Sequence, residues 1–329
     1  MPTTRRRALA WLGCPALVAA WPTGVRAAGG WPSRPVHIAV PAPGGSSLDI
    51  VARLLGERLQ ARWGQPVVVD NKPGAGGLLG TDVAAKAAPD GHTLALSFNG
   101  PIAFAPFLYA KVPYDAAKDL RPVVMTTSQP NVLAVNAAKV PAHSVKEFAA
   151  WARAARGAVN YASLGKGSSA HLTMALFMAE AGFPATHVPY NGSPPAALAL
   201  AQGEVDAAFM VAPALLPHVQ SGKVRLLAVS SAQPVDSLKD LPTLASAGYP
   251  RVESMAWNGL FAPAATPAAV VEQINADVNT VLADPAVRAT LAQQGLTPVG
   301  GSAADFQRLV EAEQKRWGPI IQSLGVRLD

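Results

Sequence analysis

Short apolar segments alternate with amphipathic segments in the first third of this chain, and this alternation restricts the possible folds more than any other feature. Residues 36–40, 66–70 and 92–97 form apolar runs, whereas residues 49–62 and 77–88 have the pattern of helices. Strands that are apolar on both faces are typical of parallel sheets covered by helices. The pattern therefore predicts an α/β fold built on a mainly parallel sheet flanked by helices.

A second set of the same kind follows Asn131. It begins with an apolar strand at 132–135, and Ser144 and Glu147 form a capping box that opens a helix at 145–156. This repetition predicts a second α/β lobe. The set continues with strands at 159–162, 187–190, 205–210 and 224–230, and with helices at 169–181, 194–202 and 213–220.

The C-terminal part holds one more strand, at 254–262, and three helices, at 267–282, 285–294 and 303–324. We expect these helices to pack on the first set, so that the first lobe is discontinuous and at least two strands cross between the lobes as a hinge. The predicted boundaries are 28–131 with 254–329 for the first lobe, 132–231 for the second lobe, and 232–253 for the crossing region.

Two glycine- and serine-rich loops, at residues 41–49 and 163–171, each leave a strand and open a helix. Free N–H groups and the positive end of a helix converge on an anion in such places. One loop alone is equally well a plain turn, and we interpret Asp49 as a helix cap. The pair predicts two lobes that hold one small anionic ligand between them. The predicted binding residues are Gly44, Gly45, Ser46, Ser47, Ser163, Gly165, Gly167, Ser168 and Ser169.

Four further polar residues complete the predicted ligand site. Asn99 and Asn191 follow strands at their C-terminal ends, where open α/β sheets bind ligands. His171 either faces the ligand or completes the first helical turn. Asp206 either recognises an amine or amide group of the ligand or bonds to neighbouring backbone. Lys166 is interpreted as a solvated side chain.

The N-terminus has the three parts of a secretory signal. Residues 4–7 are basic, residues 8–20 are apolar, and residues 25–28 offer a small-residue cleavage site after Ala27. The general secretory route is the default, with twin-arginine export as the alternative. The only cysteine, Cys14, lies inside this segment, so lipidation is a further alternative. Residues 1–27 are thus predicted to be a signal peptide.

Removal of this segment changes the charge of the chain. Residues 1–27 contain four arginines and no acidic residue, so the formal net charge falls from +6 to +2. The remaining sequence has no basic stripe, and this excludes a nucleic acid as the expected partner.

The motifs of common enzyme classes are absent or incomplete in the sequence. Gly165, Gly167 and Ala170 fit a dinucleotide fingerprint, but the next strand, at 187–190, is not followed by the acidic residue that would hold a ribose. The histidines lack metal-binding spacing, and there is no Gly-x-Ser-x-Gly elbow. We therefore predict no cofactor, no metal and no catalytic residue, with a secreted serine hydrolase on an α/β scaffold as the alternative function.

Seven segments carry recognisable motifs: residues 31–36, 64–69, 71–77, 89–94, 161–163, 187–190 and 222–225. Together they resemble the Bug family, the receptors of tripartite tricarboxylate transporters. The resemblance runs in order along the mature chain, and it implies a two-lobed periplasmic binding protein of the type II, or Venus flytrap, kind. It also implies a small carboxylate ligand (a dicarboxylate, tricarboxylate, aromatic acid or amino acid), a monomer, and membrane components of the transporter as partners.

Overall fold

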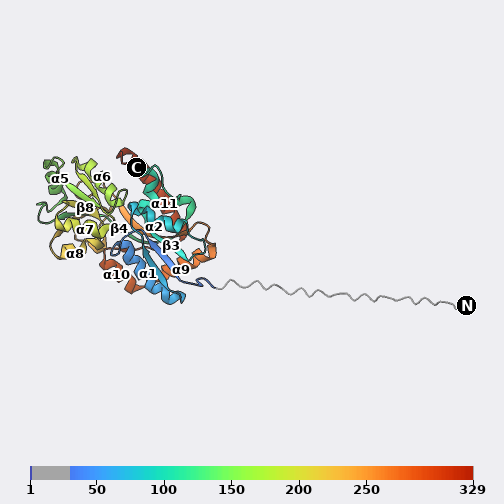
Figure 1. Ribbon diagram of the computed structural model, residues 1–329. Helices are drawn as coiled ribbons and strands as arrows, with labels where there is room; N and C mark the ends of the chain where they lie inside the picture. Colours follow the sequence, from blue (N-terminus) through green and yellow to red (C-terminus); the bar gives the residue numbers. More distant parts are fainter. Residues whose placement is uncertain (2–29, 329) are drawn as a thin grey trace. The chain divides into compact units, whose positions relative to one another are not determined.

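Two β-sheets organise the chain in the computed structural model, which describes Met1 and residues 30–328. The predicted signal peptide at 1–27, its cleavage after Ala27 and the alternative of lipidation at Cys14 lie outside the described residues. From Pro32 onward the chain clusters into one unit. Figure 1 shows the two groups of elements within this unit, one built mainly from the middle of the sequence and the other from both ends.

The first sheet has six strands in the order β11-β4-β10-β3-β1-β2. It therefore combines strands from both ends of the sequence, as expected for a discontinuous lobe. The strands are β1 (Val36–Val40), β2 (Val67–Asn71), β3 (Thr93–Phe98), β4 (Leu120–Pro130), β10 (Met255–Pro263) and β11 (Thr297–Pro298).

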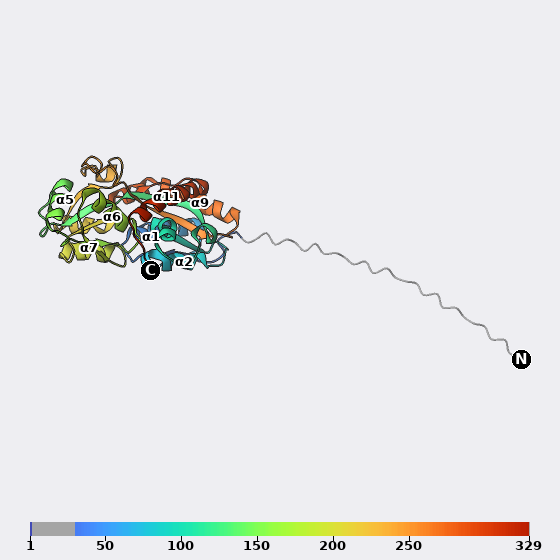
Figure 2. The ribbon, with the colours of Figure 1, turned by 90° about the horizontal axis from the view of Figure 1, so that it is seen from above.

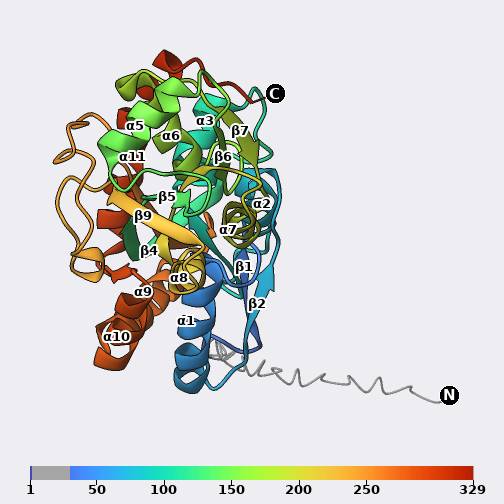
Figure 3. The ribbon, with the colours of Figure 1, turned by 90° about the vertical axis from the view of Figure 1, so that its left-hand side faces the viewer.

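The helices α2 (Leu78–Ala85) and α11 (Ala303–Ser323) share an apolar core with β3 and β10. The helices α1 (Ser47–Trp63) and α9 (Ala268–Ala283) contact each other although they are far apart in the sequence, as Figure 3 shows. The C-terminal helices thus pack on the first sheet. The remaining helices of this part are α3 (Ala105–Leu108), α4 (Ala116–Asp119) and α10 (Pro285–Gln293).

The second sheet has five strands in the order β7-β6-β8-β5-β9. The strands are β5 (Val132–Asn136), β6 (Asn160–Ser163), β7 (Thr186–Pro189), β8 (Ala207–Met210) and β9 (Val224–Val229). The helices are α5 (Val145–Ala154), α6 (Ser169–Ala181), α7 (Ser193–Gln202) and α8 (Leu216–Gln220), and Figure 2 shows α5, α6 and α7 apart from α1, α2, α9 and α11.

Apolar residues on the central strands of the second sheet are buried on both faces. In β5, Leu133 and Val135 join the core under α5 and α6, whereas Val132 and Ala134 join the core under α7. Successive side chains of a strand point to opposite faces, so a strand covered on both sides must be apolar throughout. This is the physical basis of the α/β fold that the sequence predicted, and that fold class is confirmed.

Both sheets are more mixed than the sequence predicted. The strand β1 runs parallel to β2 and β3, and β6 runs parallel to β7 and β8. However, β10 is antiparallel to β3 and β4, and β5 is antiparallel to β8 and β9. The antiparallel pairs involve the strands through which the chain enters or leaves a sheet. These strands run in the opposite direction to the strands of the repeated βαβ units.

A single residue, Asn131, separates β4 from β5. The segment that connects β9 to β10 passes next to Asn131. Its side chain is fully buried, and its amide nitrogen lies 3.3 Å from the hydroxyl oxygens of both Thr173 and Ser254. Its backbone N–H donates to the hydroxyl of Ser230 at 2.9 Å. Hydrogen bonds therefore fix the place where the chain crosses between the sheets. The residue limits given above for the lobes stay a prediction.

Candidate ligand-binding site

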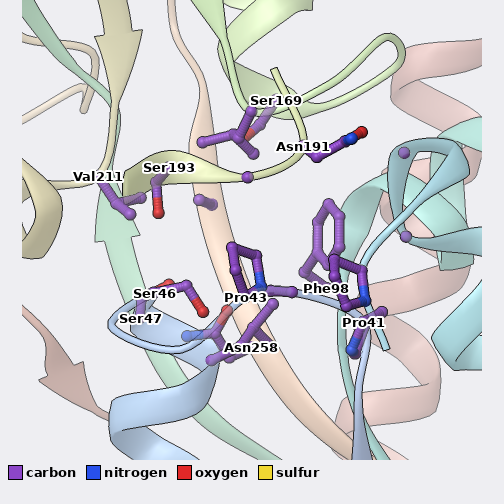
Figure 4. Close-up of a pocket in the computed structure, with 18 of the residues that line it drawn as sticks. Pro41, Pro43, Ser46, Ser47, Phe98, Ser169, Asn191, Ser193, Val211 and Asn258 are labelled. Carbon is purple, nitrogen blue, oxygen red and sulfur yellow. The ribbon is translucent and has the colours of Figure 1, made fainter. Parts of the chain in front are cut away.

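A cavity lies between loops of the first sheet and helix starts of the second, and Figure 4 shows part of its lining. Among the described residues that line it, none has a charged side chain. The lining residues are Pro41, Ala42, Pro43, Ser46, Ser47, Leu48, Pro73, Gly74, Gly76, Gly77, Phe98, Asn99, Gln129, Leu164, Ser169, Tyr190, Asn191, Gly192, Ser193, Val211, Ala256 and Asn258.

The first glycine-serine loop ends in a firmly capped helix. Ser46 has extended backbone angles, and its hydroxyl accepts a hydrogen bond from the N–H of Asp49 at 3.2 Å. The carboxylate of Asp49 accepts from the N–H of Gly45 at 2.9 Å and from Nε of Arg53 at 3.0 Å. The N-cap is therefore Ser46 and not Asp49, whose carboxylate bonds instead to the backbone of the loop. The N–H of Gly45 bonds to this carboxylate.

Three helices begin at the cavity. Ser47 and Leu48 are the first two residues of α1, Ser169 is the first of α6, and Ser193 is the first of α7. The N–H groups at these positions have no partner within their helices, and the helix dipole gives each end a partial positive charge. In Figure 4, Ser46 and Ser47 lie on one side of the pocket, and Ser169 and Ser193 lie on the opposite side.

The two walls meet closely at Gly192, the residue before α7. Its φ is 113°, and a Cβ built on it would lie 2.4 Å from Cδ of Pro43 in the first loop. Only glycine allows this approach of the two backbones. Both residues line the cavity.

The second glycine-serine loop lies beside the cavity and packs on the first lobe. A Cβ on Gly76 would lie 2.6 Å from the carbonyl oxygen of Lys166, and a Cβ on Gly167 would lie 2.8 Å from Cδ1 of Leu108. The hydroxyl of Tyr109 donates to the same Lys166 carbonyl at 3.4 Å. Gly76 and Gly167 therefore allow close contact between the two lobes, a role that the sequence analysis did not assign to them.

Several polar groups of the second loop bond within the loop and its helix. The hydroxyl of Ser168 caps α6 by accepting from the N–H of His171 at 3.3 Å, and it donates to the carbonyl of Gly165 at 2.7 Å. Nδ1 of His171 accepts from the N–H of Gly167 at 3.2 Å. Oγ of Ser163 lies 2.7 Å from Nε2 of His187.

The structure brings five of the thirteen predicted site residues to the cavity: Ser46, Ser47, Asn99, Ser169 and Asn191. Asp206 lies elsewhere and accepts from the N–H of Asn160 at 2.9 Å, which is the backbone role named as its alternative. The predicted residues outside the lining are Gly44, Gly45, Ser163, Gly165, Gly167, Ser168, His171 and Asp206. Direct ligand contacts for these eight stay a prediction.

The sequence analysis missed several cavity residues, of which Gln129 is the most polar. Gln129 is in β4, a strand that the sequence analysis did not predict, and it pairs with Ala256 of β10. The side chains of Phe98, Val211 and Asn258 were also missed. Phe98 and Val211 directly follow apolar runs, and the rule that ligands bind beyond strand ends would have found them.

Among the described residues, no group of three or more His, Cys, Asp or Glu side chains has an arrangement that could hold a metal ion. The helices of residues 30–328 include none that is long and apolar enough to cross a membrane.

Residues 51–326 match the family model described as the tripartite tricarboxylate transporter family receptor. The chain belongs to this family. The resemblance to Bug proteins that the sequence indicated is therefore confirmed, and members of the family are periplasmic binding proteins. Protein BugT of Bordetella pertussis is a 38% identical family relative over 299 residues, which cover 91% of this chain and 91% of that protein.

Two solved structures of this receptor family resemble the chain over nearly its whole length. Rpa4515 of R. palustris, solved with adipate, is 35% identical with a TM-score of 0.87 and covers 90% of this chain and 99% of its own. MatC from Rhodopseudomonas palustris, solved with bound malate, is 32% identical with a TM-score of 0.84 and covers 88% of this chain and 100% of its own. The two-lobed architecture predicted from the sequence is confirmed by these similarities.

Proposed function

We propose that this protein is a periplasmic receptor that binds a small carboxylate between its two lobes and delivers it to the membrane components of a tripartite tricarboxylate transporter. The convergence of α1, α6 and α7 on one cavity supports this proposal most strongly. Helix N-termini attract anions, and the cavity offers serine hydroxyls as further donors.

The energetics of such a site are sufficient without a cation. Micromolar affinity requires about 8 kcal/mol. Hydrogen bonds to a charged group contribute roughly 1.5–3 kcal/mol each, and a partly buried helix terminus contributes up to about 2 kcal/mol. Four or five donors are enough after the cost of ordering the ligand. Because two relatives were solved with adipate and malate, dicarboxylates are the first compounds to test.

Export and assembly are part of the same proposal. A signal peptide at 1–27 would direct the chain to the general secretory route and be cleaved, so that the mature chain reaches the periplasm. The mature protein would act there as a monomer. The protein would return its ligand unchanged. The alternative of a serine hydrolase is weak, because Ser163, the serine beside His187, is fully buried and lies outside the cavity lining.

The test is a calorimetric titration of the mature chain with a panel of C4 to C7 dicarboxylates, including adipate and malate, and with amino acids and aromatic acids. We expect at least one acid to bind with micromolar affinity and to be recovered intact afterwards. Failure of every acid to bind below millimolar concentration would contradict the proposal. Recovery of a hydrolysed product from a panel of esters would favour the enzyme instead.

A further inference from the structure

Gln129 brings an unsatisfied amide to the cavity. Its side chain is 1% exposed, and among the described residues neither its nitrogen Nε2 nor its oxygen Oε1 has a hydrogen-bond partner. Buried polar groups in native proteins are nearly always hydrogen-bonded, because burial without a partner costs free energy. An unpartnered amide on a residue that lines a ligand cavity therefore indicates a group that the ligand satisfies.

Asn99, the residue after β3, also lines this cavity and has a second polar atom without a partner. Its amide nitrogen donates to the carbonyl oxygen of Met255 at 3.0 Å. A carbonyl oxygen only accepts, so this bond fixes the orientation of the amide and leaves Oδ1 as the free atom. Within the described part of the chain, Oδ1 of Asn99 is buried and has no partner.

Both residues flank the start of β10. Gln129 of β4 pairs directly with Ala256, and Asn99 bonds to Met255, the neighbouring residue. Both also line the cavity to which the helix N-termini contribute. The free atoms at this place are two acceptors, Oδ1 of Asn99 and Oε1 of Gln129, and one donor group, the NH₂ of Gln129.

This set of atoms suits a neutral group better than a second anion. A carboxylate only accepts hydrogen bonds, so it would use the NH₂ of Gln129 and leave two oxygen atoms facing its own negative charge. The described cavity residues include no cationic side chain to offset that burial. A carboxamide has one acceptor and one NH₂ group, and these complement the free atoms.

We infer that the ligand is a monocarboxylate whose far end is a neutral group that both donates and accepts hydrogen bonds, such as a carboxamide, and that Gln129 and Asn99 bind this end. The inference rests on the proposed receptor function and specifies its ligand class. Gln129 accordingly determines specificity, whereas the helix N-termini bind the carboxylate.

The test compares each dicarboxylate with its own monoamide by calorimetry at pH 7.5, with glutarate against glutaramate and adipate against adipamate. We expect the wild-type protein to bind the monoamide at least about tenfold more tightly. Gln129→Met keeps the length of the side chain but removes both polar atoms, so it should weaken the monoamide at least about tenfold and abolish the preference for the monoamide over the dicarboxylate. Gln60→Met, at an exposed position of α1, is the matched control and should change neither.

The outcomes separate this inference from the receptor function. Equal or tighter binding of the dicarboxylate by the wild-type protein would overturn the inference and leave the receptor function intact, and this comparison needs no variant to fold. A wild-type preference for the monoamide that survives Gln129→Met would overturn the assignment to Gln129. If no acid of either kind binds, the receptor function fails and the inference fails with it.

Discussion

The imidazole rings of His171 and His187 stack face to face beneath the second loop, with 4.0 Å between their centroids and 9° between their planes. Tyr161 stacks on the other side of His187 at 4.9 Å. Desolvation by burial, together with the charge of Lys166, lowers the pKa of His171 to about 4. Burial, His171 and Lys166 lower the pKa of His187 to about 3. Both rings are therefore neutral at pH 7.

The stack predicts a loss of stability in acid. In the unfolded chain these histidines take up protons near pH 6.5, whereas in the folded protein they stay neutral down to pH 3–4. The free energy of unfolding therefore has its full value above pH 6.5 and decreases as the pH falls below 6.5. The shifted pKa of His171 alone should lower the free energy of unfolding by about 2 kcal/mol between pH 6.5 and pH 5. Urea unfolding at both pH values measures this.

Two variants separate the stack from other acid effects. His171→Gln should reduce the pH dependence of unfolding by about one proton, and His143→Gln, at an exposed position, should leave it unchanged. Equal stability of the wild-type protein at pH 7 and pH 5 would show that the rings are not held neutral.

The close contact of Gly192 with Pro43 predicts that Gly192→Ala impairs ligand binding. The new methyl group would need the space of Cδ of Pro43, at 2.4 Å, so the two walls would be held apart. Affinity for the tightest acid of the panel should fall by about tenfold or more. Gly182→Ala is the matched control, because Gly182 also has a positive φ, of 68°, but no atom lies within 4 Å of its Cβ position. It should lower stability without changing affinity.

Lys166 should contribute little to binding. It is exposed and lies outside the cavity lining. Lys166→Ala should therefore weaken binding by less than about fivefold, and affinity should depend only weakly on salt. Calorimetry at low and moderate ionic strength measures both quantities. A hundredfold loss would mean that Lys166 turns toward the ligand and supplies its counter-charge.

Ser168 should matter for stability more than for binding. Its hydroxyl caps α6, so Ser168→Ala should lower the free energy of unfolding by about 1–2 kcal/mol. Affinity measured below the melting temperature should change less than about threefold. Strongly reduced affinity with unchanged stability would instead show that the second loop binds the ligand directly, as the sequence pattern predicted.

Local patterns in the sequence were enough to place most helices and strands. The helix predicted at 169–181 has the same limits in the structure, because Ser168 caps its start and Gly182, with φ 68°, ends it. The strand β4 was missed, since Thr126–Gln129 interrupts its apolar pattern. Of these polar residues, Thr126, Thr127 and Gln129 are buried, and some are paired across the sheet, as in the bond from Asn258 to Thr127 at 3.0 Å. Such pairing is not visible in one sequence.

The candidate site was predictable only in part. Ser47 and Ser169 follow from the rule that helix N-termini bind anions, and both line the cavity. Gly167 has the same local pattern, yet it allows close packing between the lobes. Sequence alone does not distinguish a glycine that approaches a ligand from one that approaches another part of the chain. Gln129 was missed together with the strand that carries it.

The most direct test of the account is calorimetry on Ser47→Pro with the tightest-binding acid of the panel. Ser47 is the first residue of α1, where proline fits the helix, and Ser46 before it is extended, with φ −75° and ψ 164°. The change removes one N–H and one hydroxyl, and Ser47→Ala, which removes only the hydroxyl, is its control. We predict that Ser47→Pro binds at least about tenfold more weakly than Ser47→Ala at equal melting temperature. Equal affinity of the two variants would contradict the claim that helix N-termini hold the carboxylate.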